Sequence, residues 1–434
     1  MSEVYGPIFT VYLGFRPVVV LCGYKAVKEA LVDQAEAFSG RGQLPSFSKE
    51  FNEHGVVFAN GRRWKQLRRF TLNTLRNFGM GKRSIEERIQ EEAQALVREF
   101  RETKGVPFDP IFILSQAISN VICSIVFGDR FDYQDKQFLL LNNLITQRFR
   151  FAGSYLSTLY NIFPEIMGKM PGAHHKGYQC SQQIISFIQE RVRMQQATWD
   201  PCNPRNYIDC FLAKMEQEKQ NQDSEFCLEN LVMSTFNLFF AGTETISTTL
   251  RYGLLILLKY PQIQDRLHEE IDRVIGQDRI PATEDRNKMP YTEAVLHEIQ
   301  RFSDVFPMSL PHTVTHDTHL RGYLLPKGTY IYPLLNTVHC DPEHHANPDT
   351  FDPERFLDPQ GGFKRRDAWM PFSAGKRVCL GEGLARAELF LFFTAILQSF
   401  TLASPLPPGK ISLEPAVRDL SSVPPLYQLS MLPR

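Results

Sequence analysis

The sequence predicts a mainly α-helical fold with a small β region (α+β). Apolar residues recur at helical spacing from residue 61 to about residue 259, interrupted only by short breaks that contain glycine and proline. Segments of β-branched residues lie near both ends of the chain, and they predict a small sheet to which both ends contribute. The length of 434 residues fits either one large enzyme domain or two to three smaller ones.

The elements are predicted in the following order. Ile8–Leu13 and residues 17–21 flank a turn and form a hairpin, and residues 24–33 form a short helix. Within the helical stretch, residues 228–259 form one helix of about 45 to 50 Å, at a rise of 1.5 Å per residue. The elements that follow are helices at 261–275 and 291–302, strands at 318–325 and 329–332, a long helix at 382–397 and a strand-like tail.

Charge and cysteine content narrow the class of protein. The chain carries 48 basic and 48 acidic residues, so no overall field attracts nucleic acid, and we expect no nucleic-acid partner. The eight cysteines are scattered without a CxxC pair, which indicates a reducing compartment and neither a disulfide framework nor a zinc site. Residues 231–258 are apolar but contain Glu244 and Arg251, and they predict a buried helix instead of a membrane span.

The most informative segment is a loop that runs directly into the last long helix, Phe372-Ser-Ala-Gly375-Lys-Arg377-Val-Cys379-Leu-Gly381. Its glycines permit turns and close backbone approach. Cys379 lies just before a helix N-terminus and two residues from the cation of Arg377, and both features favour a thiolate. A lone cysteine is more often a small buried apolar residue. Here the rigid loop, with no second cysteine in reach, indicates an axial thiolate ligand to a haem iron.

Two motifs upstream of this loop fit together. Glu298 and Arg301 lie at i, i+3 on one predicted helix, and alone they would form a surface ion pair of under about 1 kcal/mol. Arg355 follows in a loop, from which it can donate to the same carboxylate. We therefore predict a buried Glu298–Arg301–Arg355 network that fixes the loops behind the haem.

The segment Ala241-Gly242-Thr243-Glu244-Thr245 lies in the middle of the longest predicted helix. Gly242 costs about 1 kcal/mol of helix stability relative to alanine. It either lets a ligand approach the backbone or makes an ordinary contact between helices. Thr245 can bond back to the carbonyl one turn earlier, and Glu244 with Thr245 is a candidate proton relay.

Trp64 and Arg68 place an indole N–H and a guanidinium one helical turn apart, where both can reach a carboxylate such as a haem propionate. The residues around them are also basic, so an ordinary basic amphipathic helix is the alternative. His312 is a further candidate donor to a propionate.

Together these motifs resemble those of the cytochrome P450 family, specifically the animal microsomal enzymes that oxidise drugs, other xenobiotics and unsaturated fatty acids. The resemblance covers essentially all 434 residues and includes 64–68, 76–83, 239–245 and 372–381. It implies a single catalytic domain over residues 1–434. In that fold, haem b lies between the longest helix and the helix that follows the cysteine loop.

The resemblance also implies roles for the candidate residues. Cys379 ligates the iron and favours cleavage of the O–O bond, while Thr245 and Glu244 deliver protons to bound dioxygen. The implied haem-binding residues are Trp64, Arg68, His312, Phe372, Arg377, Cys379 and Gly381. Some relatives add an arginine from the loop before Gly55, where this chain has residues Asn52-Glu53-His54, so we expect a less complete grip on the propionates.

The implied activity is that of an unspecific monooxygenase, which inserts one atom of O2 into a lipophilic small molecule. The predicted substrate pocket is apolar and aromatic, which suits a xenobiotic, a steroid or an unsaturated fatty acid. Its expected lining is Phe236, Phe239, Phe240, Ala241, Val305, Phe306, Met308, Leu310 and Leu420. Of these, Phe240 should narrow access to the iron.

The family implies that electrons come from NADPH through a flavoprotein NADPH–cytochrome reductase, with cytochrome b5 as a possible second donor. The candidate docking residues are the basic clusters at 62–69, at Lys82 with Arg83, and at 364–366, unless these are ordinary solvated charges. The expected location is the cytosolic face of the endoplasmic reticulum membrane, in contact with its surface. Because the chain starts without the apolar anchor and proline-rich hinge of its relatives, cytosolic or peripheral association is the alternative.

Two other functions fit the sequence. The first is a haem-thiolate isomerase of lipid peroxides, which needs no external electrons; such relatives tend to lose the acid–alcohol pair that this chain keeps. The second is a truncated, non-catalytic product. Thr245→Ala separates the monooxygenase, which should then leak reducing equivalents to peroxide, from the isomerase, which should be indifferent.

Overall fold

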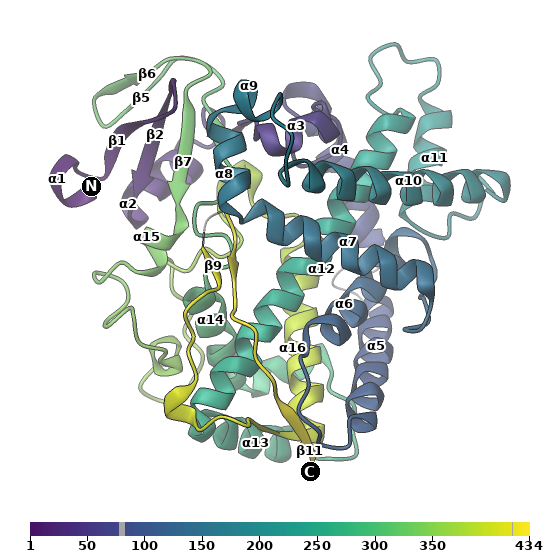
Figure 1. The fold of residues 1–434 in the computed structure, drawn as a ribbon, viewed down its shortest axis with the longest axis vertical. Helices are drawn as coiled ribbons and strands as arrows, with labels where there is room; N and C mark the ends of the chain where they lie inside the picture. Colours follow the sequence, from purple (N-terminus) through teal and green to yellow (C-terminus); the bar gives the residue numbers. More distant parts are fainter. Residues whose placement is uncertain (78–82, 419) are drawn as a thin grey trace.

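A long central helix, α12 (Leu228–Lys259), crosses the middle of the molecule, with helices packed around it and a small sheet at one edge (Figure 1). The computed structural model describes residues 1–77, 83–418 and 420–434. The C-terminal half of α12 is buried on all sides, because its residues are apolar or small around the whole circumference. Both ends of this helix lie where the sequence predicts them.

In the described part of the chain, eleven helices and a π-helical turn come before α12. They are α1 (Ser2–Tyr5), α2 (Tyr24–Lys28), α3 (Pro45–Phe51), α4 (Gly61–Asn77), α5 (Arg83–Glu102), α6 (Ile111–Val126), α7 (Lys136–Ala152), α8 (Tyr155–Ile162), α9 (Pro164–Met167), α10 (His175–Ala197) and α11 (Tyr207–Gln217). After α12 come α13 (Pro261–Val274), α14 (Pro290–Ser303), α15 (Leu335–His339) and α16 (Glu382–Ser399). The helix expected at 24–33 is α2 continued by the π-helical turn Glu29–Asp33.

The main sheet has five strands in the order β1-β2-β7-β4-β3. Its strands are β1 (Ile8–Leu13), β2 (Arg16–Cys22), β7 (Tyr330–Leu334), β4 (His312–Thr313) and β3 (Gly40–Arg41). The predicted hairpin is confirmed, since β1 pairs antiparallel with β2. Separate two-stranded pairs are β5 (Thr318–Leu320) with β6 (Tyr323–Leu325), β8 (Phe400–Ala403) with β11 (Ser430–Pro433), and β9 (Val417–Arg418) with β10 (Ser422–Val423). The C-terminal tail therefore pairs with β8, directly after α16, and adds no strand to the main sheet, so the expectation that both ends of the chain form one sheet is corrected.

Close packing between α6 and α12 explains the glycine in the middle of α12. A Cβ at Gly242 would lie 2.5 Å from Cδ1 of Ile122 on α6. Gly242 also borders the cavity described below, so the structure is compatible with both predicted reasons for this glycine. Across the described ranges, no helix is both long and apolar enough to cross a membrane.

The cysteine loop is fixed by its contact with the sheet side of the molecule. Gly375 has φ +73°, and a Cβ there would lie 1.7 Å from the carbonyl oxygen of Leu31, so only glycine fits. The loop passes directly into α16, whose N-terminus is capped by Gly381. This arrangement holds Cys379 opposite the middle of α12.

Candidate active site

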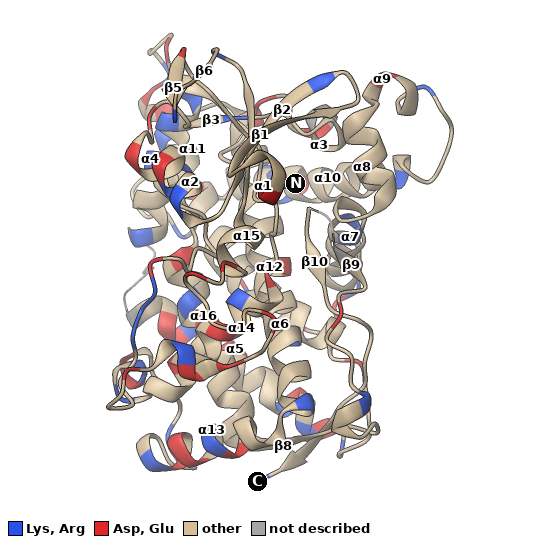
Figure 2. Cartoon of the chain, turned by 90° about the vertical axis from the view of Figure 1, so that its left-hand side faces the viewer, with Lys and Arg blue, Asp and Glu red and all other residues tan. Residues whose placement is uncertain are grey.

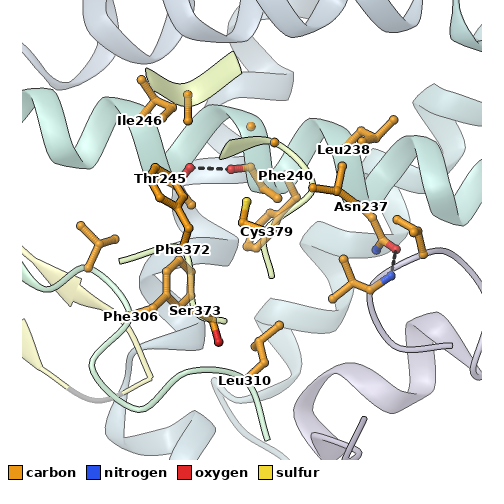
Figure 3. A pocket seen from close by; sticks show the side chains of 18 of the residues that line it. Asn237, Leu238, Phe240, Thr245, Ile246, Phe306, Leu310, Phe372, Ser373 and Cys379 are labelled. Carbon is orange, nitrogen blue, oxygen red and sulfur yellow. Dashed lines mark hydrogen bonds between the residues drawn. The ribbon is translucent and has the colours of Figure 1, made fainter. Parts of the chain in front are cut away.

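A cavity of about 330 Å³ separates the middle of α12 from the cysteine loop. Cys379 and Phe372 border it on one side, and Ala241 and Thr245 of α12 border it on the other (Figure 3). The structure therefore brings together the two motifs that the sequence placed on either side of a haem.

The loop positions Cys379 through its backbone. The N–H of Cys379 donates to the carbonyl of Phe372 at 2.9 Å, and the exposed surface of the cysteine borders the cavity. Burial raises the pKa of the Cys379 thiol, and the backbone N–H of Gly381 and the cation of Arg68 lower it by less. The helix N-terminus thus acts on the thiol in the predicted direction, and burial acts against it. A metal ion that coordinates the sulfur would deprotonate it.

Arg377 does not act on the sulfur, because its guanidinium is directed elsewhere. Its Nε donates to Ser39 O at 2.7 Å and its Nη2 to Ala59 O at 2.8 Å. The guanidinium carbon lies 3.9 Å from the ring centroid of Trp64. Trp64 and Arg377, each predicted to hold a propionate, thus form one cation–π unit at the rim of the cavity, a contact that the sequence did not predict.

Two more arginines stand beside this unit. Arg68 donates to Val378 O at 2.5 Å, and Arg41, on β3, donates to Leu310 O at 3.2 Å. Burial lowers the pKa of Arg41 to about 9 and that of Arg377 to about 8, with the neighbouring arginines as the second cause. Within the described chain, no carboxylate forms an ion pair with Arg41, Arg68 or Arg377. Three partly or wholly buried cations without an anion indicate a site for an acidic ligand.

Among the described residues, two buried ring nitrogens without partners lie near these arginines: one belongs to Trp64, which borders the cavity, and the other to His312, which does not. The indole Nε1 of Trp64 and the Nε2 of His312 are buried and have no hydrogen-bond partner. The Nδ1 of His312 donates to Phe38 O at 2.8 Å, and burial, with Arg41 as second cause, lowers its pKa to about 3. An anion placed beside His312 would raise that pKa and let Nε2 donate as well.

These residues fit haem b, which combines an iron for the sulfur with two propionates for the cations. Arg41 is a further cation at this cavity, and the sequence reasoning missed it. The sequence feature that could have indicated this cation is the position of Arg41 between two glycines, Gly40 and Gly42. A Cβ at either glycine would lie within 3 Å of the neighbouring strand or ring.

The Glu298–Arg301–Arg355 network is buried behind the cysteine loop. Arg301 donates Nε and Nη2 to the two carboxylate oxygens of Glu298, each at 2.7 Å, and Arg355 Nε donates to Oε1 at 3.0 Å. The remaining guanidinium nitrogens donate to carbonyls of the loops around residues 339–350. The carboxylate is fully satisfied, which makes the network rigid.

On α12, the two members of the predicted proton relay face different surroundings. Thr245 borders the cavity, and its hydroxyl donates to Ala241 O at 2.7 Å (Figure 3). Glu244 does not border the cavity. Its Oε1 accepts from the hydroxyl of Thr146 on α7 at 2.6 Å, and burial raises its pKa. The structure therefore corrects the expectation that Glu244 lies beside the iron, because its side chain follows the face of α12 that packs on α7.

The predicted substrate pocket divides into two groups. Phe240, Ala241, Val305, Phe306, Leu310 and Leu420 border the cavity. Phe236, Phe239 and Met308 do not: Phe236 packs against Phe51, and Phe239 packs against Phe127. Apolar residues that the sequence reasoning missed complete the wall, namely Phe47, Phe51, Phe58 and Phe149, because α3 and α7 approach α12 only in the folded chain.

The basic residues predicted to dock the reductase are partly paired with acidic residues of the chain itself. Arg62 pairs with Asp223, and Arg63 pairs with Glu225, so the loop before α12 neutralises the start of α4. Lys65 and Arg69 are exposed. Lys82 lies outside the described residues, as does the side chain of Arg83. Figure 2 shows acidic and basic segments mixed along this side of the molecule.

Comparison with known proteins agrees with this site. The sequence profile of the family described as Cytochrome P450 matches residues 1–431. Cytochrome P450 2G1 of Oryctolagus cuniculus and Cytochrome P450 2A13 of Homo sapiens are each 55% identical to the chain over all 434 residues, which correspond to 88% of each relative. Cytochrome P450 2B4 of Oryctolagus cuniculus is 54% identical with the same coverage.

Proposed function

This chain belongs to the cytochrome P450 family, and from that premise we propose that it acts as an unspecific monooxygenase with Cys379 as its iron ligand. The protein is a haem-dependent monooxygenase that uses O2 and electrons from NADPH, delivered through a flavoprotein reductase, to oxidise lipophilic compounds. The observation that carries the proposal is the position of Cys379 opposite Thr245, in a cavity whose rim holds three arginines without acidic partners.

In this proposal the role of each residue follows from its position around the cavity. When bound, haem supplies the activation of O2. Cys379 binds its iron, while Arg41, Arg68, Arg377 and Trp64 hold its carboxylates. Thr245 holds a proton at Oγ1, which faces the cavity. Glu244, whose pKa burial raises, is the preceding residue on α12, and its carboxyl group is held on the α7 side by Thr146.

The apolar lining supports a lipophilic substrate. Phe240 and Phe306 both pack against Phe149 and line the cavity, so bulky ligands must fit between aromatic rings. Steroids, unsaturated fatty acids and aromatic xenobiotics share this chemistry. We propose that the haem site and the substrate pocket belong to one catalytic domain over residues 1–434.

A membrane surface and cytochrome b5 are further proposed partners, with the cytosolic face of the endoplasmic reticulum as the location. Contact with a membrane surface is supported by an exposed apolar patch. The patch consists of Tyr12 and Phe15 of the β1–β2 hairpin, Tyr155 of α8 and Ile166 of α9. The hairpin and α8 are in contact, since Arg16 donates to Asn161 O. Phe15→Glu with Ile166→Glu should weaken binding to phospholipid vesicles, and unchanged binding would refute the patch.

The test of the proposed activity is turnover of a lipophilic aromatic probe with NADPH, reductase and isotopically labelled O2. We expect one labelled oxygen atom in the product and no turnover without reductase. Thr245→Ala should lower product per NADPH and raise hydrogen peroxide. Product formed from a lipid peroxide without reductase, and unaffected by Thr245→Ala, would instead support the isomerase.

A further inference from the structure

A buried histidine lies between the Glu298 network and the cysteine loop. His339 ends α15, has 1% of its surface exposed, and borders the cavity on the side away from Thr245's helix. Nothing in the monooxygenase reaction described above uses it. Three of its polar atoms nevertheless have defined partners in three different elements.

The backbone of His339 belongs to the Glu298 network. Its carbonyl accepts from Nη1 of Arg301 at 3.0 Å. Because Arg301 is also held by Glu298 through two hydrogen bonds, the end of α15 is fixed relative to α14.

Both ring nitrogens of His339 have hydrogen-bond partners, on opposite sides of the imidazole. Its Nδ1 lies 3.0 Å from Oδ1 of Asp304, and its Nε2 lies 3.2 Å from the backbone N of Met370. A backbone N–H can only donate, so Nε2 accepts, and the ring hydrogen is on Nδ1, from where it donates to Asp304. Asp304 itself is held in place, because its other oxygen accepts from Asn336 Nδ2 at 3.0 Å. The carboxylate therefore fixes both the tautomer and the plane of the ring.

Met370 begins the segment that carries the cysteine loop. The N–H of Ser373 donates to Met370 O at 3.0 Å, and the carbonyl of Phe372 accepts from the N–H of Cys379 at 2.9 Å. Pro371, between them, has no N–H to offer. The hydrogen bond between His339 and Met370 thus connects the segment before Cys379 to the rigid Glu298 network.

We propose that His339 is a positioning residue for Cys379: its imidazole, oriented by Asp304, holds Met370 and so sets where the loop presents the sulfur to the haem iron. The inference rests on the proposed role of Cys379 as the iron ligand. His339 touches neither the iron nor the substrate in this account. It acts through the backbone of residues 370–379.

Amide variants can separate the two contacts of the ring. The side-chain amide of asparagine lies where Nδ1 of histidine lies, and that of glutamine lies near Nε2. His339→Gln therefore keeps an acceptor for Met370 N–H, whereas His339→Asn keeps only the contact with Asp304. His339→Leu removes both contacts and fills the same space.

The measurement is made on the haem-loaded, reduced protein with carbon monoxide, where thiolate ligation gives a strongly red-shifted Soret band. The rate at which mild denaturant converts this band to the unshifted form, and the reduction potential, report on the loop. We expect His339→Asn and His339→Leu to convert about fivefold faster than the wild type, since each leaves a buried N–H without a partner. His339→Gln should stay within about twofold of the wild type.

His268→Leu is the matched control. It removes a histidine on α13 whose ring also bonds to the backbone of a distant segment, in this case by donating to Phe400 O at 3.3 Å, and which, among the described residues, makes no hydrogen bond to the cysteine loop. Equal rates and potentials for His339→Gln and His339→Asn would overturn the proposal, as would equal acceleration by His268→Leu. If His339→Leu fails to fold, the difference between His339→Gln and His339→Asn still tests the proposal. A wild type without the red-shifted band would refute the role of Cys379 instead.

Discussion

At the scale of single residues, the arginine cluster shows what a sequence can and cannot reveal. Trp64, Arg68 and Arg377 were predictable because each lies in a motif with a fixed spacing. Arg41 was not, because it reaches the cluster through the pairing of β3 with β4, in which Arg41 lies opposite His312, 271 positions away in the sequence. The misplacement of Glu244 has a similar cause: adjacent positions on a helix point in different directions, and only the position of α7 decides which one is covered.

Arg41→Gln tests the assignment of the missed cation. A charge-assisted hydrogen bond contributes about 1.5 to 3 kcal/mol, so we expect haem to dissociate at least about tenfold faster from this variant. The measurement is transfer of haem to an excess of apomyoglobin, followed by absorbance. Arg191→Gln, which removes a guanidinium stacked on Phe131 of the protein's other side, is the control. Equal rates for Arg41→Gln and the wild type would contradict the assignment.

Phe239 and Phe240 are neighbours of the same type with different surroundings, and they provide a second test. Phe239→Ala should lower the free energy of unfolding by about 3 to 5 kcal/mol, because it opens a void in the core. Phe240→Ala removes a ring that faces the cavity, so it should cost less stability and admit bulkier ligands. Chemical denaturation and ligand-induced spectral shifts measure the two effects. Identical behaviour of the two variants would show that the assigned orientations are wrong.

At the scale of elements, long helices were predicted well and irregular segments poorly. The ends of α12, α13 and α14 follow from apolar spacing and from Pro261 and Pro290 at their starts. The π-helical turn after α2 and the pairing of the C-terminal tail with β8 depend on packing that no local pattern encodes. The same applies to the aromatic part of the pocket wall that α3 and α7 contribute, namely Phe47, Phe51 and Phe149.

The helix α14 also predicts a pH dependence of stability. Burial lowers the pKa of His297, which packs against Trp369, from its ordinary value near 6.5 to about 4. The folded state therefore binds fewer protons than the unfolded state between these values. Stability from this group is fully present above about pH 6.5 and is lost as the pH falls toward 4, by about 1.4 kcal/mol per pH unit.

Urea unfolding at pH 7.5 and pH 5.5 tests this, with His297→Gln as the comparison. The variant should be less stable at pH 7.5 but should lose less stability on acidification, by about 1 kcal/mol. Parallel pH profiles for the two proteins would refute a role for His297 in the acid sensitivity.

At the scale of the whole molecule, the docking face is smaller than the sequence suggests. Pairing of Arg62 and Arg63 with the acidic loop before α12 leaves Lys65, Arg69 and Arg76 as the exposed cations of α4 that have no such partner in the part of the chain that the structure describes. The net charge of the chain is zero, so attraction of an acidic reductase must come from such local groups.

Lys65→Glu should slow reductase-driven turnover about threefold or more at low salt, because it reverses a charge in the docking face. Turnover driven by peroxide, which needs no reductase, should not change. Lys169→Glu, after α9 on the opposite side of Figure 2 from α4, is the control. Equal loss of both activities in Lys65→Glu would mean that the residue affects the site and not the docking.

The most direct test of the account is the ferrous carbon monoxide spectrum of the purified protein beside Cys379→Ser. We predict a strongly red-shifted Soret band in the wild type that is absent from Cys379→Ser, with haem still bound by the arginine cluster. The same red-shifted band in both proteins, or an unshifted band in the wild type, would contradict ligation of the iron by Cys379.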